Sequence, residues 1–269
     1  MIRIKGLGAL YGEAWFDEEP PGDPGVDILL YSQRPTPIPH GRSVPFLSLV
    51  SNLAETEDAI LGRFNNECRQ RIRRAAKDDL HFQFSVDPTV HLDEFWAFYE
   101  SFAKQHSLES AGRRWLASSC EARQLVLTVA SQNDAALVWH AYVVSGQTAG
   151  LEYSSSHFRN KGGTERALVA RANRWLHWRD MLRFKQMGIE RYDWGGLFQD
   201  ESVAGRVGIN DFKKSFGGQP EWTYDCEVPV TIRGRVWVPL RDAWRELSRV
   251  RRVWSRASSP VASETNPAF

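Results

Sequence analysis

Two short blocks late in the chain each combine a glycine pair with a charged side chain. The block "RYDWGG" (191–196) contains Asp193, and the block "GINDFKKSFGGQPEW" (208–222) contains Lys213. A glycine pair weakens a sheet, because glycine loses more backbone freedom on folding and buries no side chain. The blocks therefore indicate a tight turn, a close approach of the backbone to a ligand, or both. A carboxylate can orient an amine or accept its proton, and an ammonium group can stabilise a developing negative charge.

A third stretch, "RNKGGT" (159–164), lies immediately before the longest predicted helix, 164–187. Glycines allow the backbone to approach a ligand closely, and a helix N-terminus favours an anion. We therefore expect contacts with a phosphate-bearing ligand from Arg159, Gly162, Gly163 and Thr164. The alternative is an ordinary loop in which Thr164 caps the helix.

The chain lacks the sequence patterns of several other enzyme classes. The chain has no GxSxG and no HExxH, which disfavours a covalent hydrolase and a zinc enzyme. Cys68, Cys120 and Cys226 are far apart, and none of their spacings matches a zinc site. We expect no metal and a reducing compartment. The scattered histidines are expected to be structural.

The composition is that of an ordinary globular protein, with 42% hydrophobic and 25% charged residues. The formal net charge of +1 provides no global field for nucleic acid, so no DNA partner is expected. The N-terminus lacks an apolar core of signal-peptide length, and no run is long enough to span a bilayer. These features predict a cytoplasmic protein.

The elements that would position these residues follow a mixed α/β order. Hydrophobic periodicity predicts strand, helix, strand, two helices, three antiparallel strands, the long helix, strand, helix and strand. The first of these helices is expected to begin near Asn52 in a capping-box-like pattern with Glu55. The three antiparallel strands are "QLVLTVAS", "ALVWHAYVV" and "TAGLEYSSS".

The late blocks resemble the FemAB-type aminoacyltransferases and their relatives in the GNAT acyltransferase superfamily. The resemblance rests on a Tyr-Asp-aromatic/Gly-Gly strand followed by Gly-hydrophobic-x-x-Phe-Lys-x-x-Phe-Gly-Gly. The matching positions are Tyr192, Asp193, Gly195, Gly196, Gly208, Ile209, Phe212, Lys213, Phe216, Gly217 and Gly218. A second match, "CRQRIRRAAKDDL" (68–80), has Asp78 where the family usually has glycine.

This resemblance implies a GNAT-like (acyl-CoA N-acyltransferase) α/β fold, with a mixed, mostly antiparallel sheet flanked by helices. It implies an acyltransferase that acts on an amine or hydroxyl of a cell-envelope or polysaccharide-related acceptor, small or lipid-linked. FemAB proteins contain two tandem modules and some have a helical hairpin towards transfer RNA, whereas this chain has room for one full module. Acyl-CoA is therefore the expected co-substrate, with no tightly bound cofactor. Aminoacyl-tRNA and a catalytically inert binding module are the alternatives.

The resemblance also suggests roles for individual residues. Lys213 matches the lysine that stabilises charge on phosphate or on the oxyanion. Glu152 is the expected proton acceptor by analogy, the alternative being a solvated strand residue. Asp193 is expected either to orient the acceptor amine or to cap the following turn. Expected substrate contacts come from Tyr153, Tyr192, Trp194 and Phe212.

We expect three regions. Residues 1–45 are rich in proline and glycine, so they are predicted to be irregular apart from one strand at 26–31, and they could be the remnant of a first module. Residues 46–230 form the catalytic domain. Residues 231–269 form a basic helix and a disordered tail. The stripe of Trp244, Leu247, Val250 and Trp254 is expected to pack on the core, the alternative being contact with the inner face of a membrane.

Overall fold

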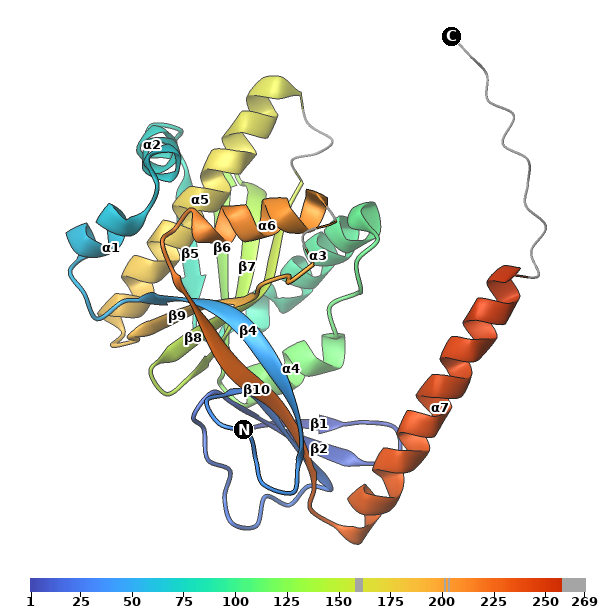
Figure 1. Ribbon diagram of the computed structural model, residues 1–269. Helices are drawn as coiled ribbons and strands as arrows, with labels where there is room; N and C mark the ends of the chain where they lie inside the picture. Colours follow the sequence, from blue (N-terminus) through green and yellow to red (C-terminus); the bar gives the residue numbers. More distant parts are fainter. Residues whose placement is uncertain (158–161, 201, 203, 258–269) are drawn as a thin grey trace.

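The computed structural model describes residues 1–157, 162–200, 202 and 204–257. These residues form a ten-stranded sheet in the order β1-β2-β3-β10-β4-β9-β8-β7-β6-β5 (Figure 1). In that order the strands are Ile2–Lys5, Leu10–Trp15, Ile28–Arg34, Gln219–Pro229, Arg42–Asn52, Arg191–Gly196, Thr148–Ser156, Ala135–Ser145, Leu125–Gln132 and His81–Ser85. Neighbouring strands are antiparallel except at β2–β3 and β8–β9, which are parallel. The expected mixed, mostly antiparallel α/β sheet is therefore confirmed.

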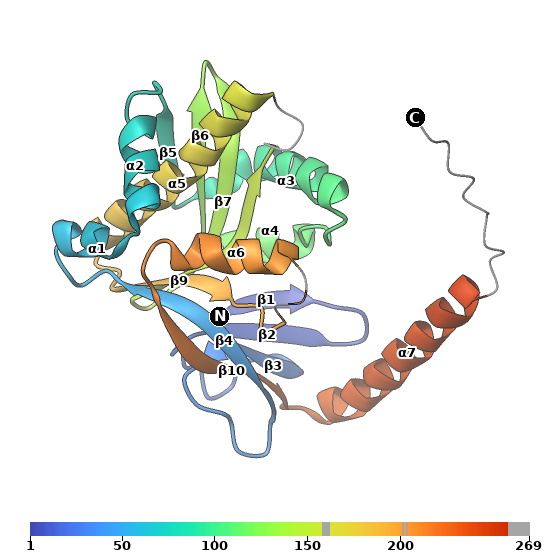
Figure 2. The same cartoon turned by 45° about the horizontal axis from the view of Figure 1, so that its top comes forward.

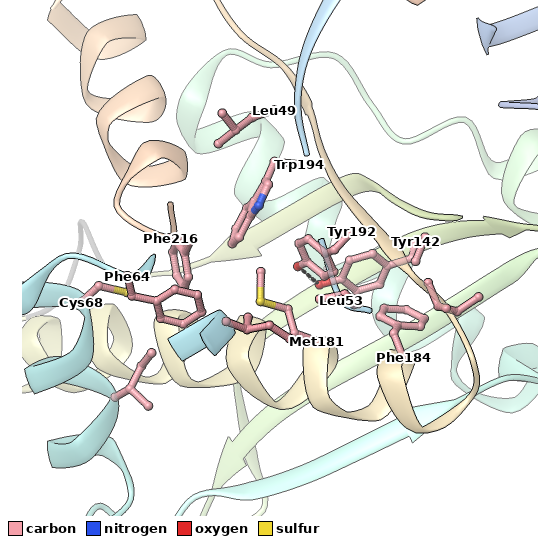
Figure 3. Packing of buried hydrophobic residues seen from close by; sticks show 14 of the residues in the cluster. Leu49, Leu53, Phe64, Cys68, Tyr142, Met181, Phe184, Tyr192, Trp194 and Phe216 are labelled. Atoms are coloured by element: carbon pink, nitrogen blue, oxygen red, sulfur yellow. Dashed lines mark hydrogen bonds between the residues drawn. The ribbon is translucent and has the colours of Figure 1, made fainter. Parts of the chain in front are cut away.

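Helices cover both faces of this sheet (Figure 2). The helices of the described residues are α1 Glu57–Arg63, α2 Asn66–Ala75, α3 Leu92–His106, α4 Arg113–Glu121, α5 Gly163–Gln186, α6 Ala204–Lys214 and α7 Ile232–Ala257, with a 3-10 turn at Pro88–His91. One core lies between the sheet and helices α1, α2 and α5, and contains Phe64, Phe184, Trp194 and Phe216 (Figure 3). A second core packs α3 and α4 on the opposite face. Each face of the sheet thus has its own core.

The predicted long helix is confirmed as α5. It ends just before Gly188, which has a φ of +81°. The expected three-stranded meander is β6-β7-β8. The single helix expected after Asn52 is wrong, because two helices form with separate caps at Thr56 and Asn65. Asn52 instead closes a tight turn by accepting a hydrogen bond from Ala54 N.

The N-terminal region differs most from its prediction. It contains three strands rather than one, and β3 pairs with β10, so the first 34 residues extend the sheet beyond the motif-bearing strands. The local sequence pattern does not predict this arrangement. The strands β2 and β3 pair in parallel, and the loop between them contains the prolines that suggested an irregular segment. This extension places Trp15 and Gln33 at the site described below.

Helix α7 projects away from the sheet, and Trp244 is 68% exposed (Figure 1). The prediction that Trp244 packs on the core is therefore wrong. The side chains of Leu247, Val250 and Trp254, and the tail 258–269, lie outside the described part of the chain. Within that part, none of the helices is both long enough and apolar enough to cross a bilayer. Contact of α7 with a membrane surface stays a prediction.

The pairing between β8 and β9 is short, and this opens the sheet. The two strands pair only at Thr148–Arg191, Ala149–Tyr192 and Gly150–Asp193. Residues beyond that point, including Glu152 on β8 and Gly195 on β9, have no partner across this gap. The separation of the two strands creates the space in which the site lies.

Candidate active site

A cavity of about 440 Å³ lies where β8 and β9 separate. Its walls come from both halves of the chain: strands β2, β3 and β4 at the N-terminus, and β8, β9, α6 and β10 later. The lining residues are Trp15, Ser32, Gln33, Phe46, Leu151, Glu152, Ser154, Trp194, Gly195, Gly196, Lys213 and Asp225. Three of the predicted site residues, Lys213, Glu152 and Trp194, therefore meet at one cavity.

Lys213 enters the cavity from the last turn of α6. Its Nζ donates a hydrogen bond of 2.7 Å to the carbonyl oxygen of Gly196. Gly195 has a φ of +71°, and a Cβ there would lie 3.2 Å from the Leu151 carbonyl oxygen and 3.8 Å from Lys213 Nζ. Burial lowers the pKa of Lys213 to about 8, against the opposing charges of Asp193 and Glu152. The first glycine pair thus provides both a left-handed turn and a close approach to the lysine.

The second glycine pair has a packing role. Gly217 also has a φ of +71°, and a Cβ there would lie 2.3 Å from the Arg63 carbonyl oxygen at the end of α1. A Cβ on Gly218 would lie 2.9 Å from Leu49 on β4. This pair allows the segment after α6 to pack closely on α1 and β4.

Asp193 lies behind the cavity wall and is 2% exposed. Its Oδ2 accepts a hydrogen bond of 2.9 Å from Ser48 Oγ, and its Oδ1 accepts one of 2.7 Å from Gly195 N. Burial raises the pKa of Asp193 to about 6, although both hydrogen bonds and the charge of Lys213 favour the carboxylate. Of the two roles considered for Asp193, the contacts fit the one in which it caps the turn.

Glu152 lines the cavity from β8 and is partly buried. Burial raises its pKa to about 8, and the nearby carboxylates of Glu13, Asp193 and Asp225 act in the same direction. Lys213 opposes the shift. With a pKa of about 8, Glu152 is mostly protonated at neutral pH, and its ionised fraction, which grows as the pH rises towards 8, can act as a general base.

Two further acids at the site were missed in the sequence. Glu13 is 9% exposed; its Oε2 accepts a hydrogen bond of 2.6 Å from Trp115 Nε1, and its Oε1 accepts one of 2.9 Å from Ser32 Oγ. Burial raises the pKa of Glu13. Asp225, on β10, lines the cavity itself. For Glu13, the sequence did contain a signal, because it is the single acid in the otherwise uncharged strand "LYGEAW".

Three predicted substrate contacts lie elsewhere. Tyr153 packs in the core beneath α3, with ring centroids 4.8 Å from Tyr99. Tyr192 is completely buried, and Phe212 packs on the core with the Arg174 guanidinium 4.8 Å from its ring centroid. None of the three belongs to the cavity lining. Trp194, although 1% exposed, does contribute to the wall.

The glycine loop before α5 is described only in part, since Arg159 lies outside the described residues. Gly162 is the N-cap, and Gly163 and Thr164 are already in the first turn, so the alternative of Thr164 as N-cap is wrong. A separate hollow of about 380 Å³ is formed there by Arg71, Gly163, Arg166, Ala167 and Ala170. Arg71 on α2 is within 2.6 Å of Glu67. The loop joins β8, which lines the cavity, to the N-terminus of α5 beside this hollow.

A buried polar network links α5 to the sheet beneath the cavity. Tyr192 OH lies 2.7 Å from both His177 Nδ1 and Tyr142 OH, and Tyr142 OH donates to Asp180 Oδ2 at 2.6 Å. His140 stacks on His177 with ring centroids 3.9 Å apart. Burial, together with the neighbouring His140, lowers the pKa of His177 well below its usual value. Figure 3 shows the bond between the two tyrosines.

His140, His177 and Asp180 also have the residue types of a metal site, with ligand atoms within 4.8 Å of one another. However, Asp180 and Asn173 occupy both ring nitrogens of His140, at 2.8 and 2.9 Å. All three residues are fully buried. The contacts fit a structural network that fixes Tyr192 and so the strand that carries Asp193.

Solved structures with the same fold include two with informative names. The structure of FemX matches with a TM-score of 0.56 and 13% identity over 66% of this chain and 61% of the FemX chain. The C-terminal domain of a putative lysylphosphatidylglycerol synthetase from Agrobacterium fabrum matches with a TM-score of 0.52 and 14% identity, over 74% of this chain and 67% of that domain. The match therefore spans less than two thirds of FemX. No protein-family model matches the sequence, and no curated protein matches it either.

These identities are low, so the comparison is one of folds. At that level the chain shares its fold with FemX and with the lysylphosphatidylglycerol synthetase domain, in agreement with the fold that the sequence blocks implied. The positions of the candidate site residues come from this chain's own geometry.

Proposed function

We propose that this protein is an acyltransferase that moves an acyl group from a coenzyme A thioester to an amine or hydroxyl acceptor. The observation that carries the proposal is the convergence of Lys213 and Glu152 on one cavity where β8 and β9 separate. The same strand, β8, leads to the N-terminus of α5, where backbone N–H groups and the helix dipole favour a phosphate. A donor that lies across the two hollows would bring its thioester to the cavity.

The chemistry of transfer requires a base, an attacking group and stabilisation of the oxyanion. Glu152 accepts the proton of the acceptor as its nitrogen or oxygen attacks the thioester carbonyl carbon. Lys213 stabilises the oxyanion that forms on the carbonyl oxygen. When the carbon–sulfur bond breaks, the thiolate leaves and takes up a proton, and the proton on Glu152 passes to solvent.

The acceptor is proposed to belong to the cell envelope or to a polysaccharide precursor, small or lipid-linked. The fold shared with the domain of a putative lysylphosphatidylglycerol synthetase supports a lipid-linked acceptor as one member of this class. The resemblance of the late sequence blocks to FemAB-type aminoacyltransferases keeps an aminoacyl-tRNA donor as the second candidate.

The test is release of free thiol from acetyl-CoA and longer acyl-CoA thioesters in the presence of amine and hydroxyl acceptors. Lys213→Ala should abolish turnover, whereas Lys214→Ala, at the exposed neighbouring lysine, should retain it. Turnover in Lys213→Ala equal to that of wild type would remove the proposed role of Lys213. Lack of turnover with every thioester, together with aminoacyl transfer from charged tRNA, would favour the second donor. If neither donor reacts, the inert binding module is the better account.

A further inference from the structure

The part of the cavity formed by the N-terminal strands has an unusual local backbone. Tyr224 pairs with Arg34 and Cys226 pairs with Tyr31, so Ser32 and Gln33 together face the single residue Asp225. This is a β-bulge, a feature that redirects side chains and is enriched beside active sites. Gln33 itself has a φ of +56°, which is uncommon for a residue other than glycine. The bulge brings Gln33 and Asp225 to the same cavity wall.

Both residues present unused acceptor oxygens there. Gln33 is 6% exposed, and its Oε1 has no hydrogen-bond partner among the residues that the structure describes. Asp225 Oδ1 accepts a hydrogen bond of 2.9 Å from Gln33 N, while Oδ2 accepts none from the described residues. A buried oxygen without a partner is costly, so it indicates a group that donates to it. The Trp15 side chain, 5% exposed, contributes an aromatic surface to the same wall.

Carboxyl groups predominate at this wall. Asp225 lines it and Glu13 lies directly behind Ser32, and burial raises the pKa of both, so a bound cation would favour their ionised forms. Glu152 faces the same space but, with a pKa of about 8, adds little charge at pH 7, and the cationic Lys213 is hydrogen-bonded to the Gly196 carbonyl. Arg34, the nearest arginine in sequence, contacts the exposed Glu19 and the Tyr31 ring, and both of these residues line a different hollow. Carboxylates, a free amide oxygen and an indole ring together are the groups that bind an ammonium ion.

We propose that Gln33, Asp225 and Trp15 form a subsite for a positively charged ammonium group that does not itself react. The identity of the ligand as one of the two reactants rests on the proposed function. The subsite itself does not, because it is defined by the contacts of Gln33, Asp225 and Trp15. The reacting end of the ligand would lie at Lys213 and Glu152, and a second, cationic end would lie at the bulge. The subsite selects ligands with such a charge over otherwise similar neutral or anionic ones.

The test uses n-butylammonium and n-butanol as probes, titrated separately by calorimetry into the full-length protein at pH 7 without any acyl donor. Wild type should bind the ammonium probe at least about tenfold more tightly than the alcohol, the size of effect expected for a charge-assisted hydrogen bond. Asp225→Asn and Gln33→Leu should each remove most of that preference. Asp134→Asn, the same chemical change at an exposed position in the β6–β7 turn, should retain it.

Glu152→Gln changes the proposed reacting end of the cavity and leaves the subsite intact, so this variant should retain the preference for the cation. Equal binding of the two probes to wild type would overturn the inference, as would a preference lost in Glu152→Gln but kept in Asp225→Asn. Asp225→Asn preserves size and the bond to Gln33 N, so it tests the idea even if Gln33→Leu fails to fold. Acyl-CoA binding, measured separately, tests the proposed function: cation binding without thioester binding supports the subsite and contradicts the donor.

Discussion

The ammonium group of Lys213 donates a 2.7 Å hydrogen bond to the carbonyl oxygen of Gly196, and this bond joins the end of α6 to the end of β9. The two residues belong to the two glycine-containing blocks, which are 17 residues apart at these positions. The lysine can reach this carbonyl because the backbone turns at Gly195 in a left-handed conformation. The first glycine pair therefore determines where the cation lies in the cavity.

Gly195→Ala tests this role of the turn. An alanine must adopt a φ of +71°, and its Cβ would lie 3.2 Å from the Leu151 carbonyl oxygen. The left-handed conformation alone should cost about 1–2 kcal/mol in the free energy of unfolding. The displaced Gly196 carbonyl should lower turnover by up to about 100-fold. Denaturant unfolding and steady-state kinetics measure the two effects.

Gly208→Ala is the matched control. A Cβ on Gly208, inside α6, would meet no heavy atom of the described residues within 4 Å apart from the adjacent backbone of its own helix, so stability should be unchanged or rise by up to about 1 kcal/mol. Equal behaviour of the two alanine variants would show that the turn at Gly195 is not required.

The raised pKa of Glu152 predicts a pH dependence of stability. Its pKa is about 8 in the folded protein against an ordinary value of 4.5, so the folded state holds this proton more tightly than the unfolded chain. The resulting stabilisation is complete below pH 4.5 and is lost as the pH rises through 8. Urea unfolding at intervals between pH 4.5 and 8 should show a decline for wild type.

Glu152→Gln should make that decline smaller, because the amide does not titrate; the part that remains comes from other buried acids such as Asp193, whose pKa is raised to about 6. Glu109→Gln, at an exposed position before α4, should keep the wild-type slope. A slope that is the same in wild type and Glu152→Gln would show that Glu152 titrates alike in the folded and unfolded states.

Tyr192→Phe distinguishes a structural role from substrate contact. The change leaves His177 Nδ1 and Tyr142 OH without their shared partner in a fully buried setting. We expect a loss of about 1–3 kcal/mol in the free energy of unfolding, with little change in KM. Tyr224→Phe, whose hydroxyl makes no hydrogen bond to the described residues, should lose little stability. A raised KM with unchanged stability would restore the predicted substrate contact.

The elements defined by local patterns were predictable. The long helix, the three-stranded meander and the strand carrying Asp193 depend on periodicity and on glycine punctuation, which short windows of sequence contain. Glu152 and Lys213 also line one cavity, as the resemblance of the late blocks to FemAB-type proteins implied.

The missed residues depend on long-range pairing and on the alternation of strand faces. Gln33 and Asp225 meet only because β3 pairs with β10 across about 190 residues, which no local pattern records. Tyr192 and Asp193 are adjacent on β9 and so point to opposite faces of the sheet, yet both are buried and neither belongs to the cavity lining. On β8, Glu152 and Ser154 line the cavity, and Tyr153 between them points to the opposite face. A one-residue slip in register changes which side chains face a site.

The most direct test of the proposed acyltransferase is calorimetric binding of acetyl-CoA and longer acyl-CoA thioesters to the purified protein. Gly162→Asp places a carboxylate at the N-cap of α5, where it should repel a phosphate, and Gly22→Asp makes the same change in an open loop. The account predicts saturable binding to wild type and to Gly22→Asp that is lost in Gly162→Asp. Absence of binding to wild type, or equal binding to all three proteins, would contradict it.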